Sequence, residues 1–114
     1  MALKNIVRAI PLQIFNTANL VLAAFTPFAN PLPHACFAIK FINRSNRSVY
    51  ISYDGVTYHD CLPADSELPL NFQQLHQPSN DFTWMKQGTR VYLRGQPIGA
   101  VGFIYLCGYY QESL

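Results

Sequence analysis

Short runs of alternating apolar and polar residues recur along this chain, and they constrain its fold more than any other feature. The runs are separated by Pro, Gly, Asn and Asp at spacings of roughly eight to twelve residues, as in all-β domains, and helical periodicity is hard to find. A half-buried strand turns every second side chain to the core. We therefore expect a single-domain antiparallel β-sandwich or jelly-roll of about seven to eight short strands, with a small closed barrel as the alternative.

Four segments carry most of the strand prediction. Residues 36–42 are the expected central strand. Residues 67–72 are expected to form an edge strand or a bulge, because Pro69 has no N–H to donate to a neighbouring strand. Residues 89–95 form a third strand, and residues 101–110 a fourth, whose two faces are both apolar or small and should both be covered. Alternation puts Phe37, Ile39 and Phe41 on one face of the first strand and Leu68, Leu70 and Phe72 on one face of the second, and in the third Val91 and Leu93 face inward.

The first third of the chain is expected to differ in structure from the rest. We expect residues 1–33 to form an extended N-terminal arm and connector, and residues 34–114 to form the β-sandwich core. Three prolines in residues 26–34 keep that segment out of a sheet interior. The apolar run 20–25 is far shorter than the roughly twenty residues of a membrane span. We interpret the N-terminus as folded structure, in which residues 1–9 pair with another element or another subunit, with a secretion signal as the alternative.

The composition is poor in charge for a free monomer. Charged residues make up 12% of the 114 residues, against roughly 25% in an ordinary soluble protein, while the hydrophobic set reaches 50%. Such a surface is typical of a subunit covered by neighbours, although a compact surface of Asn, Gln, Ser and Thr is the alternative. The net charge of +2 is too small to indicate a nucleic-acid or anionic-membrane partner.

The three cysteines give no sign of a metal or redox motif. Cys36, Cys61 and Cys107 lie far apart and form no C-x-x-C pair. We expect buried, reduced thiols in a chain that folds in a cytoplasm, with one disulfide and a spare thiol as the alternative. No cofactor is expected, because no phosphate-cradling motif occurs.

The stretch VYISYDGVTYHDCLP, residues 49–63, predicts a β-hairpin. Asp and Gly both tolerate the positive φ that a type I′ turn requires at its central positions. With Asp54 and Gly55 as the turn, Val49 would face Asp60. Opposed residues share a face of the sheet. The expected apolar face is Val49, Ile51, Tyr53, Val56 and Tyr58, and the expected polar face is Tyr50, Ser52, Thr57 and His59.

The same stretch contains residue types that could bind a metal or hold a nucleophile. In the predicted hairpin, however, His59 and Asp60 point to opposite faces, and Asp54 lies roughly 17 Å along the strand from His59. Asp65 and Glu67 fit a solvated loop better than an acid catalyst, and no nucleophile or metalloprotease motif occurs. We therefore expect no metal site and no catalytic residue.

The doubled Asn-Arg-Ser of residues 43–48 predicts a polar turn. Arg44 and Arg47 could instead form ion pairs or hydrogen bonds with a neighbouring subunit. The candidate subunit-interface residues are Arg44, Arg47, Tyr50, His59, Tyr92, Tyr109 and Tyr110.

A characteristic order of segments lies within residues 34–110. It consists of Ile42-Asn43, the run from Ile51 to Gly55, His59-Asp60, the run from Gly88 to Tyr92, and the run from Gly108 to Tyr110. This order resembles that of small virion structural proteins of tailed bacteriophages. The resemblance implies a β-rich component of the capsid decoration, neck or tail. It also implies a protein made in the host cytoplasm and located in the virion, with other virion proteins and copies of itself as partners.

The sequence thus favours a non-enzymatic structural subunit of a bacteriophage particle. It would assemble through sheet edges, its N-terminal arm and exposed aromatic side chains, and would bind neither a specific nucleic acid nor a membrane. The alternative is a carbohydrate- or surface-binding β-sandwich module. In that case Tyr50, Trp84, Tyr92 and Tyr109 would be stacking platforms. An enzyme is the third and least favoured class.

Overall fold

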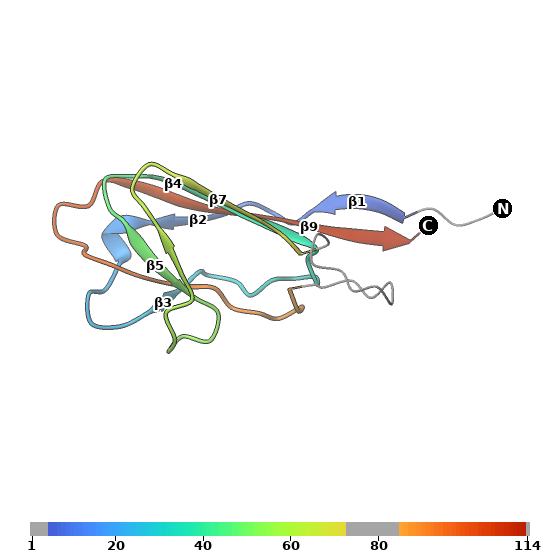
Figure 1. Cartoon of the computed structure of the whole chain (residues 1–114), viewed down its shortest axis with the longest axis horizontal. Helices are drawn as coiled ribbons and strands as arrows, with labels where there is room; N and C mark the ends of the chain where they lie inside the picture. The colour runs from blue at the N-terminus through green and yellow to red at the C-terminus, as the bar shows by residue number, and fades with distance from the viewer. Residues whose placement is uncertain (1–4, 73–84, 114) are drawn as a thin grey trace.

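The computed structural model describes residues 5–72 and 85–113, which form two antiparallel β-sheets packed face to face (Figure 1). The predicted β-sandwich is therefore confirmed, and the barrel alternative is wrong because the strands divide between two sheets. No helix in these two ranges is long and apolar enough to span a membrane. The elements are β1 (Asn5–Ala9), β2 (Gln13–Asn16), the 3₁₀ helix η1 (Thr17–Asn19), β3 (Thr26–Pro27), β4 (Ala38–Ser45), β5 (Val49–Ser52), β6 (Asp60–Leu62), β7 (Glu67–Asn71), β8 (Tyr92–Arg94) and β9 (Gly102–Ser113).

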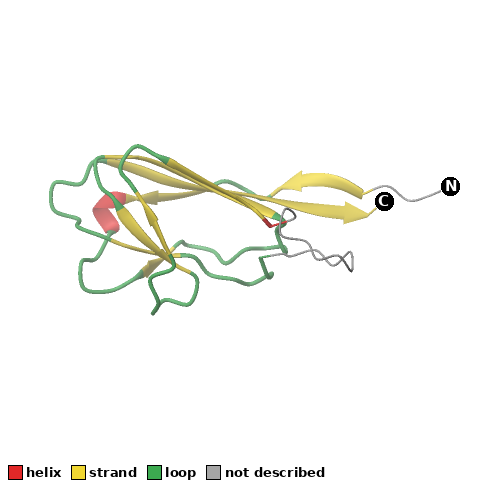
Figure 2. Ribbon diagram, in the orientation of Figure 1, coloured by secondary structure: helices red, strands yellow, loops and turns green. Residues whose placement is uncertain are grey.

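The larger sheet is built around β9, which is 12 residues long. Strand β4 pairs with it from Ala38↔Tyr109 to Ser45↔Gly102, and β7 lies outside β4. On the other side of β9, β2 and then β1 pair with successive parts of the same strand. Figure 2 shows β9 running the length of the molecule, with β1 alone beside its C-terminal end. The expected central strand, β4, is therefore one of two central strands.

The smaller sheet has the order β3-β8-β5-β6. Its inner side packs on the inner side of the larger sheet and encloses one core. Alternation within the predicted strands identified many of these residues correctly, and Leu68, Leu70 and Phe72 pack against the core from the edge strand β7 as expected. The buried core residues are Ile10, Phe15, Leu20, Phe28, Leu32, Cys36, Ile39, Phe41, Val49, Ile51, Leu62, Val91, Leu93, Ile104 and Leu106.

The expected boundary at residue 33 has no counterpart in the packing. Phe15, Leu20, Phe28 and Leu32 are buried in the same core as residues from β4 to β9. Strands β1 and β2 belong to the larger sheet, and β3 forms an edge of the smaller one. The described residues contain nine strands, against the seven to eight expected. From residue 5 onward, the expected arm and connector are thus part of the sandwich, and β1 pairs within the chain.

The predicted polar turn at residues 43–48 is wrong in its first half. Strand β4 continues to Ser45, and the side chain of Asn43 is fully buried. Its amide nitrogen lies 2.8 Å from the carbonyl oxygen of Arg47, and 3.3 Å and 3.1 Å from those of Leu62 and Pro63. Its amide oxygen accepts a hydrogen bond of 2.6 Å from the hydroxyl of Ser45. Asn43 thereby ties β4 of the larger sheet to the end of β6 in the smaller one.

We expect Asn43→Ala to lower the free energy of unfolding by about 2–4 kcal/mol, because several buried polar groups would lose their partner at once. Urea denaturation followed by tryptophan fluorescence or circular dichroism measures this change. Asn46→Ala is a matched control, since Asn46 also bonds backbone groups, at Gly99 and Val101, but in an exposed position. It should cost about 1 kcal/mol or less. Equal losses for the two variants would contradict the role assigned to Asn43.

Candidate interaction surfaces

The hairpin predicted around Asp54 and Gly55 forms with a longer loop and a different register. Strand β5 pairs with β6 as Val49↔Leu62, Tyr50↔Cys61 and Ile51↔Asp60. The partner of Val49 is therefore Leu62, two residues beyond the expected partner Asp60. Residues 53–59 form the loop between the strands. The two-residue type I′ turn is therefore wrong, although the hairpin itself is present.

Side-chain hydrogen bonds explain why the loop is longer. The Asp54 carboxylate accepts hydrogen bonds of 2.8 Å from the N–H groups of Val56 and Thr57 and from the hydroxyl of Ser52. The Ser52 oxygen in turn accepts one of 2.9 Å from the N–H of Gly55, which has a φ of 82°. These bonds, led by that from Thr57, hold the pKa of Asp54 below its ordinary value of 3.8. Asp54 therefore stabilises the loop by accepting these hydrogen bonds.

His59 and Asp60 both contact Tyr53, rather than separating to opposite faces of a strand. The ring nitrogen Nδ1 of His59 accepts the backbone N–H of Tyr53 at 3.0 Å, and the Tyr53 hydroxyl donates to Asp60 at 2.8 Å. Burial, reinforced by the hydrogen bond to Asp60, raises the pKa of Tyr53 far above its ordinary value. The arrangement keeps the tyrosine neutral and locks the end of the loop. Among the described residues, no three His, Cys, Asp or Glu side chains are grouped to hold a metal ion.

The longer loop also changes which side chains of the hairpin face solvent. Val56 and Tyr58, expected on the apolar face, are 78% and 51% exposed, whereas Ser52, expected on the polar face, is fully buried. The expected burial of Val49 and Ile51 is confirmed. The loop carries its apolar side chains to the molecular surface because its own hydrogen bonds, rather than strand pairing, set its course.

An arginine-centred aromatic cluster occupies the outer side of the smaller sheet. The Arg94 guanidinium carbon lies 5.7 Å from the ring centre of Phe25 and 5.4 Å from that of Tyr58. The ring of Tyr58 meets those of Phe25 and Tyr50 edge-on, with centroids 5.0 Å apart in both pairs. Arg94 also donates from Nε to the Leu22 carbonyl at 2.8 Å. The cluster is exposed at Tyr50 and Tyr58.

An apolar surface covers much of the larger sheet on the side away from the core. We call it the apolar outer face. Register places Tyr105 between Ile14 of β2 and Ile42 of β4 on this side. Val7, Ile14 and Phe103 are 63%, 58% and 43% exposed. The expectation that both faces of the last strand are covered is wrong for the isolated chain. The residues of the apolar outer face are Val7, Ile14, Ile42, Phe103, Tyr105 and Tyr109.

The β4–β7 side of the same face carries charge. The Lys40 ammonium lies 2.9 Å from the Glu67 carboxylate, and the Arg44 guanidinium lies 3.0 Å from it and 3.6 Å from that of Asp65. The hydrogen bond from Lys40 is the main cause that lowers the pKa of Glu67. These are exposed pairs, and such pairs add little to stability. They bound the apolar outer face on one side.

The candidate interface residues lie on several surfaces rather than one. Arg44 and Tyr109 are on the outer side of the larger sheet, whereas Tyr50 and Tyr92 belong to strands of the smaller sheet. Arg47 is held within the chain by a hydrogen bond to the Ile98 carbonyl, and His59 lies in the loop described above. Tyr110 stacks on His34. Strand alternation could have located Ile14 and Phe103, and no pattern indicated the pairing of Phe25 with Tyr58.

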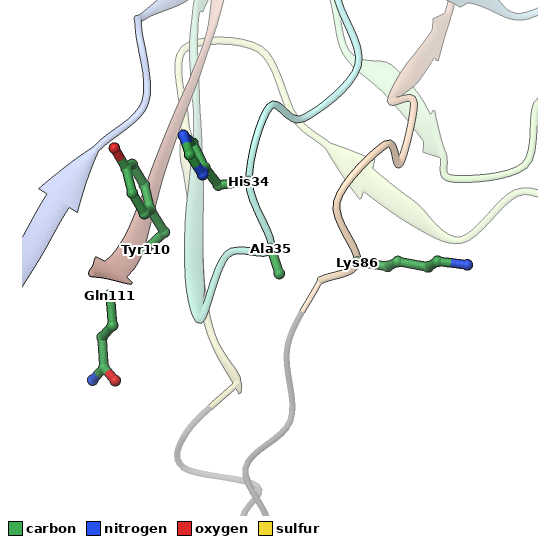
Figure 3. Close-up of a pocket in the computed structure, with 5 residues that line it drawn as sticks. All are labelled: His34, Ala35, Lys86, Tyr110 and Gln111. Carbon is green, nitrogen blue, oxygen red and sulfur yellow. The ribbon is translucent and has the colours of Figure 1, made fainter. Parts of the chain in front are cut away.

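An open hollow of about 590 Å³ lies beside the stacked rings of His34 and Tyr110. The two ring centres are 3.8 Å apart and nearly parallel. Figure 3 shows the two rings side by side, with the side chain of Lys86 extending away from both. The polar groups of this hollow therefore do not converge on a common point. Its lining residues are His34, Ala35, Lys86, Tyr110 and Gln111.

The three cysteines are free, but they are not all buried as expected. Cys36 is fully buried, and burial raises the pKa of its thiol. Cys107 is half-buried, and Cys61 is exposed on β6 opposite Tyr50. Trp84, named as a possible stacking platform, lies outside the described residues.

Comparisons with protein-family models, with curated proteins and with solved structures found no match for this chain.

We expect Asp54→Ala to lower the urea midpoint at neutral pH, because the loop would lose its main hydrogen-bond acceptor. The folded-state pKa of Asp54 is lowered, so its contribution is present above pH 3.8 and is lost as the pH falls toward the folded-state pKa. The difference in midpoint between the wild type and the variant should therefore narrow below about pH 3.8. Glu67 is present in both proteins, so its own titration cancels in this difference.

Val56→Ala is the matched control for this loop. Its side chain is exposed, and only its backbone N–H contacts Asp54. It should leave the midpoint and its pH dependence unchanged. A constant difference between the wild type and Asp54→Ala from pH 7 down to pH 2 would contradict the role of the carboxylate.

Proposed function

We propose that the protein is a non-enzymatic structural subunit of a bacteriophage particle that assembles with copies of itself and with other virion proteins. The observation that carries this proposal is the apolar outer face of the larger sheet. Four of its side chains, Val7, Ile14, Phe103 and Tyr109, are exposed in the isolated chain, and Ile42 and Tyr105 are half-buried. Contiguous apolar surface of this kind typically marks a contact with another protein. The ion pairs beside it fit the polar rim that borders many interfaces.

Two further features support a structural role over a catalytic one. The polar residues whose types could bind a metal or hold a nucleophile form hydrogen bonds that stabilise the 53–59 loop. The polar groups that line the hollow at His34 do not converge on a common point. The low content of charged residues, 12%, also fits a surface that is partly covered in an assembly. The resemblance to virion proteins in segment order supplies the particle context.

The proposal predicts that the purified wild-type protein self-associates as its concentration rises. Phe103→Lys should weaken this association about tenfold or more, because it places a charge on the apolar outer face, beside Arg44 of β4, and about 1.4 kcal/mol corresponds to tenfold. Sedimentation velocity over a wide concentration range measures the change. Val56→Lys is the control, since Val56 is also exposed but lies in the 53–59 loop.

Two results would contradict the proposal. One is a wild-type protein that stays monomeric at every concentration. The other is its absence, by mass spectrometry, from purified particles of a phage that encodes it. Equal weakening by Phe103→Lys and Val56→Lys would remove the apolar outer face as the contact surface.

A second candidate function is binding of carbohydrate, and the arginine-centred aromatic cluster favours it. Tyr50 and Tyr58 expose ring surface that a sugar could stack on, and Arg94 lies beside them. If this function is correct, Tyr58→Ala should abolish binding to an oligosaccharide array, whereas Tyr109→Ala should not. Loss of array binding in both variants, or in neither, would count against a site at this cluster.

A further inference from the structure

The edges of the two sheets differ in how they are protected against pairing with another chain. A proline at an outward-facing edge position removes a donor and blocks strand addition. On β7, the bonds of Phe72 to Phe37 and of Asn43 to Ser66 direct Pro69 outward. On β3, Pro27 is likewise outward, because the flanking residues bond to β8 and to Val91.

The other edge strands of the two sheets are short. Strand β6 has three residues and is followed by Pro63, and β2 has four residues and is preceded by Pro11 two positions earlier. Strand β1 has five residues and contains no proline. It is therefore the longest edge, among the described strands, that prolines leave open.

Strand β1 also lies where the sheet is narrowest. Pairing of β4 with β9 ends at Tyr109, while β1 pairs with β9 from Tyr109 to Ser113. Figure 1 shows β1 and the end of β9 as a two-stranded ribbon that projects beyond the rest of the sandwich. A two-stranded ribbon is marginally stable alone, because half of its backbone groups face outward. The ribbon would gain most from a further strand.

The register shows which backbone groups of β1 are free to pair. The N–H of Ile10 bonds to the carbonyl of Gly108 at 2.9 Å. Hydrogen-bonded pairs alternate along an antiparallel ladder. The pairs Arg8↔Tyr110 and Ile6↔Glu112 are then hydrogen-bonded, and the backbone groups of residues 5, 7 and 9 point to the open edge.

We propose that β1 pairs with β1 of a second copy of this chain, antiparallel across a two-fold axis at Val7. The outward backbone groups belong to residues 5, 7 and 9, so a single register can pair all of them. Val7 then opposes Val7 of the second copy, and residue 5 opposes residue 9. The two ribbons become one four-stranded sheet in the order β9-β1-β1-β9. This inference rests on the proposed function, in which copies of the chain assemble.

Charge and symmetry favour a second copy as the occupant of this edge. In this register Arg8 opposes Ile6 of the other copy, so the two Arg8 side chains do not face each other. Each Arg8 is neutralised within its own chain by Glu112 at 3.2 Å. The contact is isologous, which is the commonest form of dimer interface. Five residue pairs bury less than the roughly 1,200 Å² of a stable interface, so the dimer is weak alone and is strengthened by other contacts in an assembly.

The backbone pairing is tested by Val7→Pro and Val7→Thr. Proline removes the outward N–H without touching the bonds of β1 to β9, whereas threonine keeps the N–H and favours a strand. Sedimentation velocity should show association weakened at least about tenfold by Val7→Pro and nearly unchanged by Val7→Thr. Equal weakening by both variants overturns edge pairing in favour of a side-chain contact. Normal association of Val7→Pro overturns it outright.

Oxidative cross-linking tests the register independently of stability. In a Cys61→Ser, Cys107→Ser background, Val7→Cys should give a reducible covalent dimer, since opposed Cα atoms lie about 5.5 Å apart. Ala9→Cys should not, because the two positions would be about 13 Å apart. Cross-linking of Ala9→Cys, or none of Val7→Cys, overturns the register. A third outcome separates this inference from the proposed function. If Phe103→Lys prevents association while Val7→Pro associates normally and Val7→Cys gives no covalent dimer, the proposed function stands and this inference fails.

Discussion

The larger sheet depends on the pairing of β9 with three other strands. Its 12 residues are long enough to hold β4 along one edge and β2 and β1 in succession along the other. The N-terminal and C-terminal segments are thereby brought together, and Ile104 and Leu106 are buried at the centre of the sandwich. The opposite side of β9 carries Phe103 and Tyr109 to the surface. Strand β9 therefore contributes side chains both to the core and to the apolar outer face.

Polar side chains in this protein mainly connect elements. Asn43 joins β4 to the end of β6, and Asp54 and Ser52 organise the loop between β5 and β6. Tyr53 links that loop to Asp60. Such buried or part-buried networks stabilise a fold when each group has a partner. The surfaces proposed for assembly are instead apolar and aromatic, or consist of open backbone groups at β1.

Much of the fold was predictable from local pattern, and two of the local failures share one cause. Alternation located Ile39, Phe41 and Leu93 in the core, and Pro69 on an edge, because those segments follow a strict period of two. It failed at Asp54, where side-chain hydrogen bonds replaced a two-residue turn, and at Asn43, where a buried amide continued a strand into an apparent polar turn. Competing side-chain hydrogen bonds of this kind leave little trace in a hydrophobic pattern.

The sequence by itself determined the fold class, most strand positions and the low surface charge, because these follow from residue-by-residue periodicity and composition. Only the tertiary structure decided which face of β9 stays uncovered and which edge remains open for pairing. It also decided that Phe15, Leu20, Phe28 and Leu32 belong to the core rather than to a separate arm. These properties depend on which strands lie side by side, and non-local pairing is set by the packing of the whole sandwich.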